Sequence, residues 1–198
     1  SRLGQVQRYG NRTVSAIGRN YGMMILLTGG SACGKSSYAE DICLQGPAPR
    51  FYLAAMQPYG EDGQRKVQRH RALRAGKGFE TIERYTDYAS LKLPARGTAL
   101  LECICNLTAN EMFDENGNQS DPCERVLSGV ENLAQQCDLL IVITNDVGSG
   151  GDIYEDGTND YIRAIGAINS VLASRADTVI EMVAGIPILV KGELPLCN

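Results

Sequence analysis

The sequence predicts an α/β protein: a mostly parallel sheet with helices on both faces and an antiparallel hairpin at its C-terminal end. Three observations lead to this prediction. From Met23 onward, short apolar runs alternate with longer amphipathic segments, which is the pattern of strands joined by crossover helices. A glycine-rich turn links the first apolar run to the first helical segment. The last two apolar runs are separated only by Gly185 and Ile186, which is too short for a crossover, so they should pair as a hairpin.

The composition predicts one globular domain. With 198 residues, of which 43% are hydrophobic and 21% charged, the chain is long enough to bury one sizeable core. We expect residues 23–198 to form this domain. Residues 1–22 contain four arginines and no acidic residue. We expect them to be a flexible extension outside the fold, whether a cloning remnant, a translated upstream region or a tail.

Charge, apolar runs and cysteines argue against several classes of protein. A net charge of −4, from 19 basic and 23 acidic residues, offers no general surface for nucleic acid, which we do not expect as a partner. No apolar run reaches the roughly 18–20 residues of a membrane span, and the N-terminus lacks the apolar centre of a secretory signal, so we expect a cytoplasmic protein. The seven cysteines include no Cys-x-x-Cys pair and are expected to be reduced thiols. Cys103 and Cys105 are interpreted as core residues rather than as a zinc site.

The individual elements follow from the same pattern. The strand candidates are the apolar runs at 23–28, 50–56, 81–85, 98–104, 139–145, 178–184 and 187–192. Helices are expected from the Gly-Lys-Ser triplet to about 44, and over 61–75, 122–137 and 159–176. Asp121 is the expected N-cap of the third helix. Two polar, glycine-bearing loops remain, at 114–121 and 146–158, and the second is the better functional candidate because it follows the carboxyl end of a strand.

The turn after the first strand candidate carries a phosphate-binding motif. Its sequence "GGSACGKS" fits G-x-x-x-x-G-K-[ST]. In such a loop the backbone N–H groups turn towards a phosphate and the helix N-terminus adds partial positive charge. Lys35 would reach the terminal phosphates, and the Ser36 hydroxyl can bind Mg²⁺. The sequence therefore predicts a P-loop nucleotide-binding domain that uses GTP or ATP with Mg²⁺. The loop residues are Gly29, Gly30, Ser31, Ala32, Cys33, Gly34, Lys35 and Ser36.

A triphosphate site also needs a carboxylate to hold or orient the metal, usually at the end of another buried strand. Glu102 fits this role, because it is the lone acid inside the apolar run "TALLECI". Burying an unpaired carboxylate is costly, which favours a metal partner or another function. The alternative is a position on an edge strand that faces water. We expect Glu102 to bind the metal together with Ser36.

His70 is the only histidine in the chain and lies in the basic segment "KVQRHRALR". On a helix, Lys66 and Arg74 would lie on the same face as His70, four residues away on either side. A single histidine in a charged helix is usually a solvated surface residue. Beside a triphosphate site, however, a neutral imidazole is a nucleophile that can attack phosphorus. Neighbouring guanidinium groups would favour its neutral form and stabilise the charge of the transition state.

These motifs together resemble the bifunctional adenosylcobinamide kinase / adenosylcobinamide-phosphate guanylyltransferase family of cobalamin biosynthesis. The resemblance spans roughly 23–192. Its specificity lies in the combination of the His-Arg helix with the "TNDVG" loop, since the nucleotide loop alone is shared by many enzymes. The matching stretches, in order, are "MMILLTGGSACGKSSYAE", "FYLAA", "VQRHRALR", "TIE", "LLECI", "VITNDVGSGG" and "GIPILVKG".

The resemblance implies a RecA-like P-loop fold, a homo-oligomer that is usually a trimer, and two reactions. A nucleoside triphosphate first phosphorylates the aminopropanol hydroxyl of adenosylcobinamide, the corrinoid substrate. The helix histidine, matched by His70, then takes GMP from GTP and hands it to the new phosphate, giving adenosylcobinamide-GDP. Besides the phosphate loop, the positions that match nucleotide contacts are Ala54, Ala55, Met56, Arg71, Ala72, Leu73, Arg74, Glu83 and Glu102.

The sequence departs from the family pattern at several places. Ala32 and Cys33 stand where an Arg-Ser pair is common, and Ala55 and Met56 replace a common Thr-Ser. The late helix reads Tyr-Ile-Arg at 161–163 where Phe-Arg-Asp is usual. Two other functions stay open from the residues alone. One is a small-molecule kinase with a different substrate, in which His70 is a surface residue, and the other is a non-enzymatic GTP-dependent switch.

Overall fold

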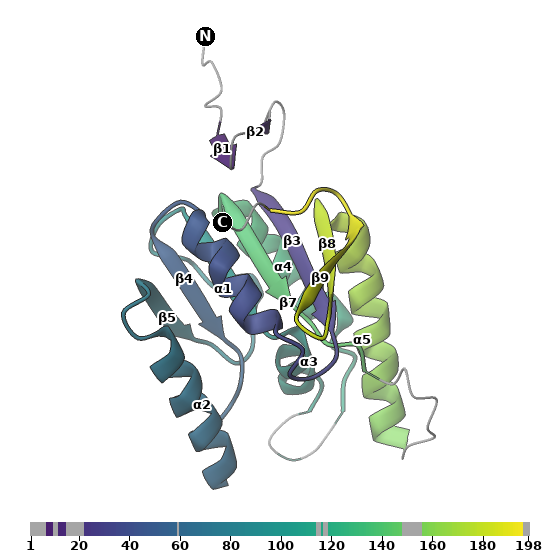
Figure 1. Ribbon diagram of the computed structural model, residues 1–198. Coiled ribbons are helices and arrows are strands. Elements are labelled where there is room, and N and C mark those ends of the chain that lie inside the picture. Colours follow the sequence, from purple (N-terminus) through teal and green to yellow (C-terminus); the bar gives the residue numbers. More distant parts are fainter. Residues whose placement is uncertain are drawn as a thin grey trace.

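In the computed structural model, the described residues are 7–9, 12–14, 22–58, 60–113, 116, 119–147 and 156–195. Their centre is a seven-stranded sheet with the order β5-β4-β6-β7-β3-β8-β9 (Figure 1). The first six strands in this order are parallel, and β9 pairs antiparallel with β8. The strands are β3 (Met23–Gly29), β4 (Arg50–Ala54), β5 (Phe79–Glu83), β6 (Thr98–Glu102), β7 (Leu139–Ile143), β8 (Thr178–Val183) and β9 (Ile186–Lys191).

Helices cover both faces of the sheet, as the sequence predicts. Figure 1 shows α1 on one face and α3, α4 and α5 together on the other, while α2 extends beyond the sheet next to β5. The helices are α1 (Lys35–Gln45), α2 (Gly60–Arg74), α3 (Ile104–Met112), α4 (Cys123–Gln136) and α5 (Asp156–Arg175), and a 3₁₀ turn, η1, covers Tyr88–Ser90. Within the described residues, no helix is long and apolar enough to cross a membrane.

The core lies on both sides of the central strands. All five residues of β7 and the first four of β6 are buried, which is why these runs are continuously apolar instead of alternating. A strand with this pattern must lie inside a sheet that is covered on both faces. The predicted mostly parallel sheet with a C-terminal antiparallel hairpin is thus confirmed.

Most expected elements lie within two residues of their predicted bounds, but one helix was missed. The run predicted as a strand over 98–104 ends at Glu102, and α3 begins two residues later. Apolar residues continue across this boundary, and Cys103 at the N-cap makes no side-chain capping hydrogen bond. The sequence therefore carries no stop signal there. At α4 the cap differs by one residue: Pro122 is the N-cap, and the Asp121 carboxylate accepts a hydrogen bond from the Cys123 N–H at 2.9 Å.

The N-terminal segment contains two short strands, β1 (Gln7–Tyr9) and β2 (Arg12–Val14), which pair antiparallel with each other in a separate sheet. The rest of the segment before Gly22 lies outside the described residues. The continuously described part of the chain starts at Gly22, whose N–H donates to the Ala134 carbonyl at 3.1 Å.

Candidate nucleotide site

The predicted phosphate loop connects β3 to α1 and is held by the neighbouring strand pair. Gly29 has φ 136°, and a Cβ at this position would lie 2.5 Å from the Met182 carbonyl oxygen of β8. Only glycine fits such a position. On the other side of the loop, the Gly185 N–H, in the turn between β8 and β9, donates to the Cys33 carbonyl at 3.0 Å. The hairpin at the end of the chain therefore supports the loop near its beginning.

Lys35 is the first residue of α1 and lies inside the loop, with only 6% of its surface exposed. Its ammonium donates to the carbonyl oxygens of Gly29 at 2.8 Å and Gly30 at 2.5 Å, and it lies 3.6 Å from the Cys33 sulfur. These contacts fix a positive charge at the place where the backbone can surround a phosphate. The geometry fits the role expected for the lysine of this motif.

The Glu102 carboxylate lies beside the start of α1. The Ser36 hydroxyl donates to Glu102 Oε1 at 2.5 Å, and the Tyr52 hydroxyl donates to Oε2. Because β6 lies between β4 and β7, the alternative of an edge strand facing water is wrong. A hydroxyl and a carboxylate oxygen at this distance are the hard oxygen ligands that Mg²⁺ prefers.

The residues present fit such an ion, although the described part of the chain contains no cluster of three or more His, Cys, Asp or Glu side chains that could enclose a metal. Mg²⁺ at nucleotide sites is typically held by one or two protein oxygens, with phosphate oxygens and water completing the coordination. Ser36 and Glu102 would supply the protein share.

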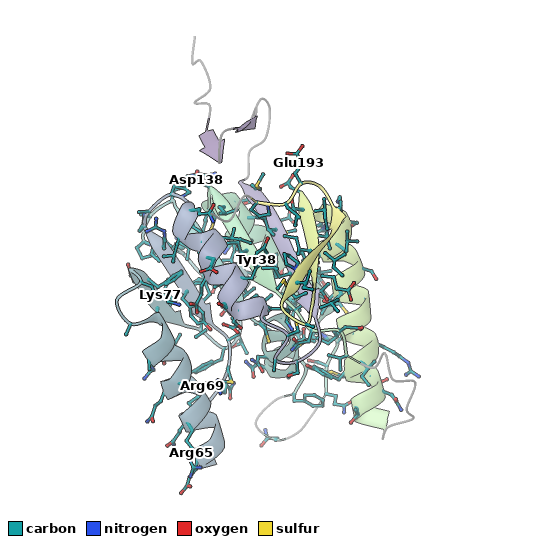
Figure 2. All side chains as sticks on the ribbon, in the orientation of Figure 1. Tyr38, Arg65, Arg69, Lys77, Asp138 and Glu193 are labelled. Atoms are coloured by element: carbon teal, nitrogen blue, oxygen red, sulfur yellow. The ribbon has the colours of Figure 1, made fainter. Side chains whose placement is uncertain are left out.

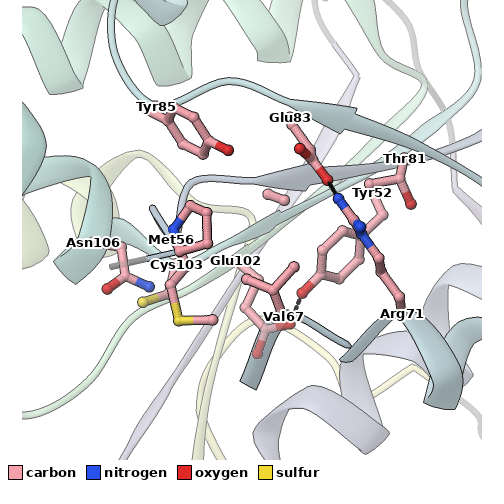
Figure 3. Close-up of a pocket in the computed structure, with 12 residues that line it drawn as sticks. Tyr52, Met56, Val67, Arg71, Thr81, Glu83, Tyr85, Glu102, Cys103 and Asn106 are labelled. Carbon is pink, nitrogen blue, oxygen red and sulfur yellow. Dashed lines mark hydrogen bonds and ion pairs between the residues drawn. The ribbon is translucent and has the colours of Figure 1, made fainter. Parts of the chain in front are cut away.

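A pocket of about 100 Å³ lies next to Glu102, at the carboxyl ends of β4, β5 and β6 (Figure 3). Helix α2 forms one wall of the pocket. There the Arg71 guanidinium makes an ion pair with Glu83, the last residue of β5. The lining residues are Tyr52, Ala54, Met56, Pro58, Val67, Arg71, Thr81, Glu83, Tyr85, Glu102, Cys103 and Asn106.

The end of β4 and the segment after it lie at this pocket. Ala54 and Met56 line the pocket, and Ala55 is buried. The Ala55 N–H donates to the Glu102 carbonyl at 3.1 Å, which joins this segment to the strand that carries the carboxylate. The expected positions Ala54, Met56, Arg71, Glu83 and Glu102 are thus brought together around one cavity.

The structure places His70 on α2, three residues after Val67 and directly before Arg71, both of which line the pocket. The side chain of His70 is not among the described ones. The same holds for the side chains of Lys66, Leu73 and Arg74, while Ala72 is exposed. The helix backbone therefore brings the histidine position to the pocket wall, and the direction of the imidazole stays a prediction.

Helix α2 and the turn after it are joined to the body by ion pairs. Besides the Arg71–Glu83 pair, Lys77 in the turn following α2 lies 2.5 Å from Glu40 of α1 (labelled Lys77 in Figure 2). Glu40 is buried, whereas Arg71 and Glu83 are partly exposed. The Lys77–Glu40 contact therefore connects the turn after α2 to α1, the helix that begins at the phosphate loop.

Sequence reasoning missed two residues that organise the pocket. Tyr52 is buried in β4 and reaches Glu102 with its hydroxyl; a tyrosine within a strand buried on both faces is the one signal that could have indicated a polar partner. Asn110 of α3 donates from Nδ2 to the Ala55 carbonyl at 2.8 Å and the Tyr85 carbonyl at 3.0 Å. No signal for Asn110 was available, because α3 itself was not predicted.

The loop after β7 begins beside the phosphate loop. The Asp146 N–H faces the Gly29 carbonyl at 3.4 Å. The Thr144 hydroxyl donates to Asn169 Oδ1 of α5 at 2.7 Å, and Asn169 Nδ2 donates to the Asn145 carbonyl at 3.3 Å. Of the predicted functional loop 146–158, residues 148–155 lie outside the described residues.

A glycine-rich phosphate loop with its lysine, and an acidic residue at the end of a nearby parallel strand, define a P-loop nucleotide-binding protein with a RecA-like sheet. The chain belongs to the family described as cobinamide kinase / cobinamide phosphate guanyltransferase, whose profile matches residues 25–190. The resemblance found in the sequence is therefore confirmed.

Two curated relatives match over their full lengths. The bifunctional adenosylcobalamin biosynthesis protein CobU of Salmonella typhimurium LT2 is 32% identical over 186 residues, which covers 85% of this chain and 100% of the relative. The protein of the same name from Escherichia coli K12 is 29% identical over 185 residues, with the same coverage of 85% and 100%. Among solved structures, the flagellar accessory protein FlaH of Methanocaldococcus jannaschii is 11% identical with a TM-score of 0.45, over 87% of this chain and 80% of that one.

Proposed function

We propose that this protein phosphorylates adenosylcobinamide and then transfers GMP from GTP to the product through a GMP–His70 intermediate, giving adenosylcobinamide-GDP. Membership of the cobinamide kinase / cobinamide phosphate guanyltransferase family supports both reactions. The roles of Lys35, Ser36, His70 and Glu102 in these reactions are proposed below.

One observation carries the proposal: the helix with the single histidine and the strand with the metal-binding carboxylate line the same pocket. Val67 and Arg71 of α2 lie in its wall together with Glu102, and Glu102 contacts Ser36 of the phosphate loop. A nucleotide whose terminal phosphates lie in the loop would extend into a space bounded by α2. The position of His70 on α2, between Val67 and Arg71, supports its assignment as the nucleophile.

In the first reaction the aminopropanol hydroxyl oxygen attacks the γ-phosphorus and loses its proton to solvent, the bond between the γ-phosphorus and the bridging oxygen breaks, and a nucleoside diphosphate leaves. The Lys35 ammonium and the loop N–H groups stabilise the charge on the transferred group. Mg²⁺ held by Ser36 and Glu102 would supply further positive charge against the triphosphate. The chemistry needs no protein nucleophile, since the substrate provides its own hydroxyl.

In the second reaction a nitrogen of His70 attacks the α-phosphorus of GTP and pyrophosphate leaves. An oxygen of the corrinoid phosphate then attacks the same phosphorus, the P–N bond breaks, and the histidine is regenerated. The acceptor is an anion that faces a charged triphosphate, so direct displacement is difficult. A covalent intermediate on a neutral nitrogen divides it into two easier steps.

The test is incubation of the protein with α-labelled GTP and Mg²⁺, followed by measurement of label on the denatured protein. We expect acid-labile, base-stable label, which is the behaviour of a phosphoramidate. His70→Ala should lose this label and the formation of adenosylcobinamide-GDP, and it should keep the kinase activity. Phosphorylated corrinoid is measured in the same samples.

Lys66→Ala is a suitable control, because it removes a basic residue four positions before His70 in the sequence while retaining the nucleophile. It should keep the label. Persistent labelling of His70→Ala would contradict the assignment, since the chain has no second histidine. Absence of label from the unmodified protein, with kinase activity on another alcohol, would favour the small-molecule kinase, and nucleotide binding without either reaction would favour a switch.

A further inference from the structure

Asn110 of α3 joins two segments that leave neighbouring strands at the nucleotide pocket. Its carboxamide nitrogen donates to the Ala55 carbonyl, after β4, at 2.8 Å and to the Tyr85 carbonyl, after β5, at 3.0 Å. Asn110 is not one of the lining residues, but both segments line the pocket, through Met56 and Tyr85 (Figure 3). The side chain therefore connects two parts of the pocket wall without being part of it.

The two segments lie beyond the strand ends, where the sheet no longer fixes them. Residues 55–58 follow β4 and residues 84–85 follow β5, and neither segment has regular secondary structure. The Arg84 N–H donates to the Ala54 carbonyl at 3.2 Å, which joins them close to the strand ends. Asn110 adds one contact to each segment. Helix α3 is a firm base for these contacts, because five of its nine residues are buried.

The segment after β4 also contacts α2. A Cβ added to Gly63 of this helix would lie 3.0 Å from the Pro58 carbonyl carbon, so the segment and the helix approach each other closely. Helix α2 supplies Val67 and Arg71 to the pocket. The position of the segment held by Asn110 therefore affects the pocket walls at the ends of β4 and β5 and along α2.

We propose that Asn110 is a positioning residue for the nucleoside part of GTP, because it holds Met56 and Tyr85 in place before the nucleotide binds. This role rests on the proposed function, in which the phosphates lie in the loop and the rest of the nucleotide extends into the pocket. Without the two hydrogen bonds, GTP binding would have to order two irregular segments, and such ordering weakens affinity. The phosphate loop is held by the β8–β9 turn instead, so phosphate binding does not depend on Asn110.

The test compares the binding of two ligands by calorimetry in the presence of Mg²⁺. One is GTP, and the other is inorganic tripolyphosphate, which has three linked phosphates and no nucleoside. The unmodified full-length protein should bind GTP more tightly. Asn110→Ala should bind GTP about 10-fold more weakly and tripolyphosphate with unchanged affinity. A general loss of stability would weaken the binding of both ligands alike, so the difference between them measures the positioning role.

Asn132→Ala is the matched control. Asn132 of α4 makes the same kind of contacts: its Nδ2 donates to the Tyr88 carbonyl at 2.9 Å and to the Leu91 carbonyl at 2.7 Å, and neither of these residues lines the pocket. The two alanine variants should have similar decreases in melting temperature, while Asn132→Ala keeps its affinity for both ligands.

Asn110→Asp is the second variant, and its result decides if Asn110→Ala does not fold. It keeps the shape of the side chain but presents carboxylate oxygens to two carbonyl oxygens, so it should lose at least as much GTP affinity as Asn110→Ala.

The positioning role is overturned if Asn110→Ala binds GTP as tightly as Asn132→Ala, if both ligands lose affinity together, or if Asn110→Asp keeps normal GTP affinity. Asn110 would then serve packing only. Failure of the proposed function gives a different result: the unmodified protein would bind GTP no more tightly than tripolyphosphate, because the nucleoside would not use the pocket.

Discussion

The Tyr52 hydroxyl holds one oxygen of the Glu102 carboxylate, while Ser36 contacts the other. A partner behind a metal-binding carboxylate orients it, and removal of such a partner typically costs 10–100-fold in metal affinity. We expect Tyr52→Phe to keep the fold but to raise the Mg²⁺ concentration needed for half-maximal GTP binding by about 10-fold. Titration of GTP binding with Mg²⁺ measures this change.

Tyr88→Phe is the matched control for Tyr52→Phe. Tyr88 is also buried, and its hydroxyl donates to the Arg84 carbonyl at 2.7 Å rather than to a group in the pocket. This variant should lose about 1 kcal/mol of unfolding free energy without a change in the Mg²⁺ requirement. Equal requirements in both tyrosine variants would show that Tyr52 serves packing only.

A second prediction at the residue scale concerns Lys35. Its ammonium, now bound to two loop carbonyls, is the positive charge available to the terminal phosphates. The same charge serves γ-phosphoryl transfer and the departure of pyrophosphate. Lys35→Ala should therefore slow both reactions by about 100-fold or more, measured as phosphorylated corrinoid and as label on the protein. If one reaction were spared, two separate nucleotide sites would have to be considered.

At the scale of elements, the β8–β9 hairpin supports the phosphate loop through its turn. Ala184 and Gly185 have φ values of 50° and 82°, as in the tight turns that connect two-residue hairpins. The Gly185 N–H bonds the loop at Cys33. Gly185→Ala should cost about 1–2 kcal/mol of unfolding free energy and also lower the affinity for GTP, because strain in this turn disturbs the loop. Chemical unfolding and calorimetry provide the two measurements.

The Gly78→Ala variant is the control that distinguishes the effect of backbone strain from the effect of proximity to the phosphate loop. Gly78 has a φ of 73°, and a Cβ added there would meet open space, as it would at Gly185. Gly78 lies before β5, however, and not beside the phosphate loop. The Gly78→Ala variant should lose similar stability and keep its GTP affinity. Loss of affinity in both variants, or in neither, would argue against support of the loop by the hairpin.

At the scale of the whole molecule, we expect the nucleotide-binding domain to be independent of residues 1–21. Gly22 and Met23 make the first backbone hydrogen bonds to the domain, to Ala134 and Asp138, and β1 and β2 pair with each other. A chain that starts at Gly22 should keep its melting temperature and its GTP affinity. A clear loss of either would mean that the N-terminal segment packs on the domain or on a second copy.

The sequence was informative where a local pattern determines the structure. The phosphate loop could be predicted from its eight-residue motif, and β7 could be predicted from a continuous apolar run. The sequence was less informative where contacts between distant segments determine the structure. The end of β6 has no stop signal, so α3 and with it Asn110 were missed. The strand predicted at 81–85 ends at Glu83. Beyond this residue the Tyr85 carbonyl accepts a hydrogen bond from Asn110, and the Arg84 side chain donates one to the Thr86 carbonyl.

The candidate site shows the same division. Glu102 could be singled out as an acid in an apolar run, and His70 as the one histidine in a basic helix. The sequence could not predict the hydrogen bond between Tyr52 and Glu102. It also could not predict the ion pair between Arg71 and Glu83. Both contacts depend on the order of strands in the sheet and on the position of α2, which are set by packing over many residues.

The tyrosines of the pocket have a consequence for spectroscopy. The chain contains nine tyrosines and no tryptophan, so its ultraviolet emission comes from tyrosine alone and is not masked by a stronger fluorophore. Among the tyrosines that the structure describes, Tyr52 and Tyr85 line the pocket. A guanine base that enters beside them should quench part of the emission, and binding can then be followed optically in the unlabelled protein.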